Sequence, residues 1–117
     1  MSAKRILWLD TETYSGTDLK ASGLFKYMED PDFEILLLPF AWDDEPVRVL
    51  DLTDPVDREE LPDIIAGLQD PDVVKVAHNS PFERAAYQRG FGFYQHPEEW
   101  EDTLILCAMN GLGLSLD

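Results

Sequence analysis

Apolar residues along the chain fall into two kinds of pattern, nearly continuous runs and runs spaced by three and four. Continuous runs at 6–9, 34–42 and 73–77 predict strands, and the longest is apolar on both faces. Pro39 within it predicts a bulge or an irregular end. A polar turn then leads to an apolar run at 47–50, which predicts a hairpin. The pattern predicts three early antiparallel strands and a later one.

Helical spacing dominates the second half of the chain. Four apolar residues lie at i, i+3, i+4 and i+7, namely Leu61, Ile64, Ile65 and Leu68. They predict a helix that starts no earlier than Glu60, because a proline follows at position 62. A serine cap and a proline predict a second helix, 80–89. Asp102 is a plausible cap for a last helix at 104–110, and 18–28 predicts a short helix or an ordered loop.

Composition limits the possible functions. The chain has 117 residues, 44% of them hydrophobic, which suffices for one compact domain or part of one. Its formal charge of −15 argues against contacts in which Lys and Arg neutralise phosphates, so any nucleic acid would require cations as mediators. No run is long enough to span a membrane and no signal peptide precedes the first strand, so we expect a cytoplasmic protein. Cys107 lies in an apolar stretch and is expected to be buried.

The first candidate motif is Leu9-Asp10-Thr11-Glu12-Thr13, where the first strand ends. Residues two apart in a strand point the same way, so Asp10 and Glu12 can share one ligand. Paired carboxylate oxygens suit a hard divalent cation. Taken alone, the motif is better explained as solvated charges at a strand end.

The second candidate motif is His78-Asn79-Ser80-Pro81-Phe82-Glu83, at the junction of a predicted strand and helix. Ligands gather at the carboxyl ends of strands in α/β folds, and the free N–H groups of a helix start favour an anion. The alternative is structural, with Asn79 in a turn, Phe82 in the core and Glu83 as a favourable charge in the first helical turn.

Together the two motifs resemble the first two motifs of the DEDD (DnaQ-like) superfamily of 3′ to 5′ exonucleases. The chain is most similar to the proofreading exonuclease domain of phage-type family A DNA polymerases, and stretches 22–36, 100–104 and 111–117 share this similarity. The resemblance implies an α/β, RNase H-like mixed sheet, with three antiparallel strands followed by parallel ones and flanked by helices. We expect residues 1–117 to form a single partial domain that lacks the last strand and helix.

The resemblance also implies hydrolysis of phosphodiesters at nucleic-acid 3′ ends by two Mg²⁺ or Mn²⁺ ions. By position, Asp10, Glu12 and Glu83 would hold the metals, with Asp10 bridging both. The family usually has Asp at the position of Glu83, and Glu is one methylene longer. The residues expected to contact the substrate are Thr11, Thr13, Asn79 and Phe82.

The third motif of the superfamily, a Tyr or His followed by an Asp on a late helix, has no good match. Tyr94 and His96 have acidic residues at similar offsets, but a proline-containing loop makes surface positions the better interpretation. Asp102 is better explained as a helix cap. We therefore expect a domain truncated before the third motif, weakly active or inactive.

Three functions remain open. The first is the nuclease part of a DNA polymerase, acting on the 3′ end of single-stranded nucleic acid, DNA rather than RNA. The second is a stand-alone exonuclease acting on RNA or short oligonucleotides. The third is a catalytically silent binding or assembly module, which would self-associate through a sheet edge exposed by the missing last strand.

Overall fold

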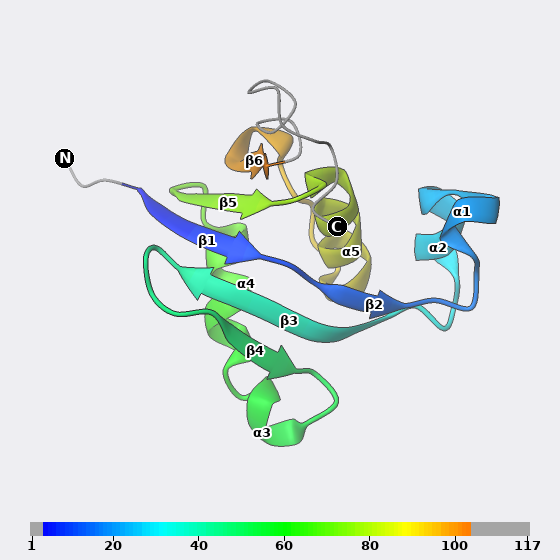
Figure 1. Ribbon diagram of the computed structural model, residues 1–117, viewed down its shortest axis with the longest axis horizontal. Coiled ribbons are helices and arrows are strands. Elements are labelled where there is room, and N and C mark those ends of the chain that lie inside the picture. Colours follow the sequence, from blue (N-terminus) through cyan, green and yellow to red (C-terminus); the bar gives the residue numbers. More distant parts are fainter. Residues whose placement is uncertain (1–3, 104–117) are drawn as a thin grey trace.

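A single mixed sheet organises the computed structural model, which describes residues 4–103 (Figure 1). The strands are β1 (Arg5–Leu9), β2 (Glu12–Tyr14), β3 (Glu34–Trp42), β4 (Arg48–Asp51), β5 (Val73–Ala77) and β6 (Trp100–Asp102). The helices are α1 (Leu19–Ser22), α2 (Leu24–Glu29), α3 (Pro55–Arg58), α4 (Leu61–Gln69) and α5 (Ser80–Phe91), and a 3₁₀ turn, η1, spans Pro97–Glu99. The described strands follow the order β2-β3-β1-β5-β6, and β4 pairs with the other edge of β3.

The predicted strand directions are confirmed. β1 and β4 run antiparallel to β3, whereas β5 runs parallel to β1. β6 was not predicted, because its three residues, Trp-Glu-Asp, show no apolar run. It pairs parallel with β5 from Lys75↔Trp100 to Ala77↔Asp102. The sheet edge beside β5, which we expected to be exposed for self-association, is therefore occupied.

The helices follow the predicted spacing with shifted ends. α4 begins at Leu61, as expected from the proline at its second position. α5 begins at Ser80, but its cap residue is Asn79, which adopts the left-handed conformation at φ 67°. The helix continues to Phe91 and ends at Gly92, whose φ of 83° favours glycine. The predicted helix at 104–110 and Cys107 lie outside the described residues.

Pro39 does not produce the bulge predicted in β3, since it stays in the ladder opposite Val49. The register of β3 shifts nearer its start instead, where Glu12 lies opposite Leu37 and Thr13 opposite Ile35, so that β3 carries one extra residue. The N–H of Asp10 donates to the carbonyl of Pro39 at 3.1 Å, but proline has no N–H to return. β1 consequently ends at Leu9, and pairing with β3 resumes at Glu12. This break in the ladder positions the first candidate motif.

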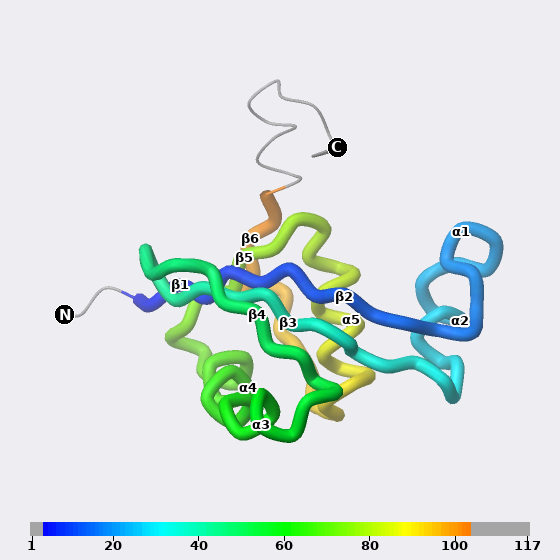
Figure 2. The backbone as a smooth tube through the Cα atoms, turned by 60° about the horizontal axis from the view of Figure 1, so that its bottom comes forward, coloured from blue at the N-terminus to red at the C-terminus, as the bar shows by residue number. Residues whose placement is uncertain are grey.

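Helices α3, α4 and α5 lie on one side of the sheet (Figure 2). The core lies between them and the sheet, where Leu7 and Leu38 have no exposed surface. Lys75 is also fully buried, and its Nζ lies 2.6 Å from Glu99 Oε1 and 2.8 Å from the carbonyl of Asp70. This ion pair links η1 to β5, and it leaves the buried charge of Lys75 paired. Within residues 4–103, no helix has the length and apolar character needed to cross a membrane.

Candidate active site

The first motif keeps the alternation of a strand across the break after β1. Thr11 is buried on the side that faces α5, whereas Asp10 and Glu12 are exposed. The two carboxylates therefore lie on the same side of the chain, as the period of two predicts. Neither forms a hydrogen bond or an ion pair with the residues described. Both are available to a ligand from solvent.

Glu83 lies in the first turn of α5, beyond the carboxyl end of β5, and only 3% of it is exposed. Its Oε1 accepts a hydrogen bond of 2.9 Å from the N–H of Thr11. Its Oε2 is buried and has no hydrogen-bond partner among the described residues. Glu83 thus connects the second motif to the break in the first, with one carboxylate oxygen unused.

At the contact between Glu83 and the first motif, burial and neighbouring negative charge shift the pKa values of the acidic groups. Burial raises the pKa of Glu83, hydrogen bonding from Thr11 and from the Tyr87 hydroxyl opposes this, and the nearby charge of Asp10 raises it further. Tyr87, one helical turn later, is fully buried, and its hydroxyl hydrogen-bonds with Thr11 Oγ1. Burial, followed by the charge of Glu83, raises the pKa of Tyr87 well above its usual range. Tyr87 therefore remains a neutral hydrogen-bonding group at neutral pH.

The donor set fits a divalent cation in part. A buried carboxylate oxygen without a partner, close to a second carboxylate, is a favourable location for a hard cation. However, no three His, Cys, Asp or Glu side chains within 4–103 are arranged to hold a metal ion. Asp10 and Glu83 come together, and Glu12 does not complete the group. The predicted roles of Asp10, Glu12 and Glu83 in metal binding stay predictions.

The predicted substrate contacts surround Tyr27, which the motif analysis did not single out. Thr13 Oγ1 lies 2.7 Å from the Tyr27 hydroxyl, and the ring of Phe82 lies 6.0 Å from the ring of Tyr27 between centroids. The Thr11 side chain instead points to Tyr87, and Asn79 is exposed at the start of α5. Their contacts with a substrate stay predictions.

Asp102 holds the start of α5 from the neighbouring strand β6. Its carboxylate accepts hydrogen bonds from Asn79 N at 2.9 Å, Ser80 N at 2.8 Å and Ser80 Oγ at 3.0 Å. Asp102 therefore caps α5, a role that was not predicted, and its predicted role as a cap of the helix at 104–110 stays a prediction because that helix lies outside the described residues. Tyr94 is 63% exposed and His96 is also exposed, as expected for residues outside the site.

Of the positions that sequence analysis missed, one had a signal in the sequence. Tyr87 lies four residues after Glu83, a spacing that places both on one helical face. No local pattern indicates that Tyr27 contacts Phe82 or that Asp102 caps α5, because these contacts join distant segments.

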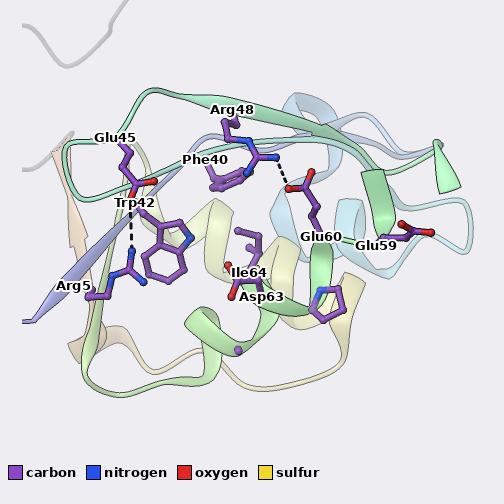
Figure 3. A pocket seen from close by; sticks show the side chains of 11 residues that line it. Arg5, Phe40, Trp42, Glu45, Arg48, Glu59, Glu60, Asp63 and Ile64 are labelled. Atoms are coloured by element: carbon purple, nitrogen blue, oxygen red, sulfur yellow. Dashed lines mark hydrogen bonds and ion pairs between the residues drawn. The ribbon is translucent and has the colours of Figure 1, made fainter. Parts of the chain in front are cut away.

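A separate cleft of about 670 Å³ lies between β3, β4 and α4 (Figure 3). Its aromatic walls are Phe40 and Trp42, and Arg5 stacks on Trp42 with its guanidinium carbon 4.1 Å from the ring centroid. None of the predicted site residues lines it. Arg48 is paired with Glu60, and Arg5 with Asp43 at 3.1 Å, so these cations are already neutralised. We do not assign the active site to this cleft.

Comparison with solved structures identifies the fold. The crystal structure of Escherichia coli RNase D, an exoribonuclease involved in structured RNA processing, superimposes with a TM-score of 0.56. The match covers 96% of this chain and 25% of RNase D, at 21% sequence identity. The chain shares the fold of this part of RNase D. This is the RNase H-like architecture predicted from the two motifs.

A sequence relative places this exonuclease-like domain in context. The DNA polymerase of Bacillus phage SP02 is 37% identical over 114 residues. The match covers 97% of this chain but 17% of the polymerase, so the chain spans about a sixth of that relative's length. No family model matches the chain.

Proposed function

We propose that the chain is the 3′–5′ exonuclease domain of a DNA polymerase, and that it hydrolyses phosphodiesters at the 3′ end of a single strand with two Mg²⁺ or Mn²⁺ ions. One observation carries the proposal: Glu83 leaves a buried oxygen without a partner beside Asp10, at a break in the sheet. A structural carboxylate in the core would be fully paired, so this oxygen is better explained as a ligand position. The polymerase relative supplies the context.

The proposed roles follow from how each carboxylate is held. Glu83 is fixed, because Thr11 N–H holds one oxygen and leaves the other free. Asp10 and Glu12 are exposed, and no described residue competes for their oxygens. When bound, the cations would stabilise the attacking and leaving oxygens of the phosphodiester. Glu12 must then turn toward the other two acids as the cations neutralise their repulsion.

The chain alone should hydrolyse slowly. Residues 4–103 place no further acidic side chain beside Asp10 and Glu83 that would serve as a fourth ligand. Tyr94 and His96, the candidates for orienting water, are exposed loop residues. Cation binding is therefore the main test of the proposed function, and the rate of hydrolysis is the secondary one.

The test is Mn²⁺ titration by calorimetry, alongside hydrolysis of a single strand labelled at its 5′ end. Asp10→Asn and Glu12→Gln keep the shape of each side chain and should weaken Mn²⁺ binding by about tenfold or more. Asp44→Asn, in the exposed turn after β3, removes a matched charge and should leave binding unchanged. Mn²⁺ binding that ignores both site substitutions would contradict the proposal.

Matched DNA and RNA strands in the same assay address the second candidate function, a stand-alone exonuclease acting on RNA. The likeness to RNase D favours that candidate, although the likeness is one of fold. A stepwise loss of nucleoside monophosphates from DNA supports the polymerase assignment. Exclusive cleavage of RNA supports the alternative.

A further inference from the structure

The segment between β2 and β3 projects beyond the sheet, and its second helix, α2, contacts α5 (Figures 1 and 2). We call residues 18–29, which contain α1 and α2, the arm. The two short helices are separated by Gly23, whose φ is 87°. α1 buries no residue and α2 buries only Met28, so the arm contributes little to the core.

The inner side of the arm is anchored beside the candidate site. Leu24, Tyr27 and Met28 lie at i, i+3 and i+4 and pack toward the core. Tyr27 contacts Thr13 and Phe82, both predicted to contact the substrate. Arg89 of α5 donates to the carbonyl of Met28 at 2.8 Å. The arm is thus held next to the site rather than loosely tethered.

The outer side of the arm exposes an aromatic ring. Phe25 is 74% exposed, whereas the other five phenylalanines of the chain are buried or partly buried. Leu19 on α1 is 39% exposed, and Tyr14, just before the arm, is 52% exposed. An exposed ring on a fixed helix offers a face on which a nucleobase can stack.

The arm also carries free cations in a strongly acidic chain. Five of the nine basic residues are engaged in ion pairs or hydrogen bonds, namely Arg5, Arg48, Arg58, Lys75 and Arg89. The ammonium groups of Lys20 and Lys26 have no partner among the described residues, and both side chains are exposed. Together with Asp18 and Glu29 they make the arm neutral, in a chain whose formal charge is −15. Although Asp30 and Asp32 follow directly, a phosphate backbone meets less repulsion at Lys20 and Lys26 than over the acidic rest of the chain.

We infer that the arm binds the single strand away from its 3′ end, with Lys20 and Lys26 on phosphates and Phe25 stacked on a base. The inference rests on the proposed function, because it requires a strand whose end lies at Asp10 and Glu83. The arm would be a second contact region for the single strand. Only strands longer than the terminal nucleotides would reach it.

The test measures binding to a labelled 12-nucleotide oligothymidine and to a dinucleotide, with the full chain and with Ca²⁺ as the cation. Lys20→Gln with Lys26→Gln should weaken binding of the 12-mer and reduce its salt slope by about 1.4, since each phosphate contact contributes about 0.7 for a single strand. Phe25→Leu should weaken binding of the 12-mer by about 5-fold to 150-fold, whereas Phe25→Trp should preserve it. Binding of the dinucleotide should not change.

Matched controls are available on the same chain. Lys4→Gln removes an exposed lysine just before β1, and Val56→Ala trims a side chain that is 69% exposed on α3. Both should bind like the unsubstituted chain. Thermal unfolding confirms that each variant is folded.

Each outcome separates the two proposals. Unchanged 12-mer binding and salt slope in the arm variants overturn the inference while the proposed function stands. Equal losses for the dinucleotide and the 12-mer also overturn it. If the arm variants lose 12-mer binding while Mn²⁺ binding is unaffected by Asp10→Asn and Glu12→Gln, the proposed function fails and the arm remains a binding surface for the strand.

Discussion

At the scale of single residues, Glu83 combines a buried charge with an unused oxygen. Its pKa is raised in the folded state, chiefly by burial, so the folded chain holds this proton to a higher pH than the unfolded chain does. Protonated Glu83 therefore stabilises the folded chain. This stabilisation is fully present below the pKa of Glu83 in the unfolded chain, about 4.3, and is lost as pH rises through the pKa of Glu83 in the folded chain. Without a cation, Glu83 therefore destabilises the fold at neutral pH.

We predict that Glu83→Gln raises the free energy of unfolding at pH 7 in EDTA, by on the order of 1 kcal/mol. The amide retains an acceptor for Thr11 N–H and removes the buried charge. Urea unfolding between pH 4 and pH 8 checks the result, because the gain should shrink toward pH 4. Asp44→Asn, an exposed acid in the turn after β3, controls for the change in net charge. Identical pH profiles for the two variants would contradict the prediction.

The sequence predicted part of this residue geometry and missed part of it. The period of two correctly placed Asp10 and Glu12 on one side of the chain. It could not show that Thr11 between them supplies a backbone N–H to Glu83, because that contact joins residues 72 positions apart. The resemblance led us to expect that Thr11 would contact the substrate, which stays a prediction, and it gave no sign that the Thr11 side chain is buried against Tyr87.

At the scale of elements, the start of α5 depends on β6. Asn79 holds a left-handed conformation that costs free energy in a residue with a side chain, and Asp102 secures it. Local signals predicted both helices of the second half, since spacing and caps act within a few residues. They could not predict β6, which is three residues long and is defined by its pairing with β5.

Asp102→Ala should lower the free energy of unfolding by about 2–4 kcal/mol, because two backbone N–H groups and a hydroxyl lose a charged acceptor. Asp54→Ala removes an exposed cap that accepts from Val56 N at 2.8 Å, and should cost about 1 kcal/mol. Chemical denaturation of both variants gives the comparison. Equal losses would show that Asp102 acts as an ordinary cap, without a special role in holding the second motif.

At the scale of the whole molecule, 24 acidic and 9 basic residues make the folded chain repel itself. Salt should therefore raise the melting temperature by screening, whatever cation is used. A specific site predicts an additional effect, because Mn²⁺ that binds only the folded chain stabilises it by about 2.7 kcal/mol at a concentration 100 times the dissociation constant. For a domain of this size that is a rise of about 10 °C.

We predict that Mn²⁺ raises the melting temperature of the chain beyond the rise caused by NaCl at the same ionic strength. Asp10→Asn and Glu83→Gln should each abolish this difference, because each removes a carboxylate from the pair that creates the cation position. The rise in melting temperature caused by NaCl alone should persist in both variants, since each removes only one charge from a total of −15. Thermal scans at several Mn²⁺ concentrations separate the two effects. Should Asp10→Asn retain the full Mn²⁺ increment, the cation stabilises the fold through its diffuse negative charge, and the junction of Asp10 with Glu83 is not a binding site.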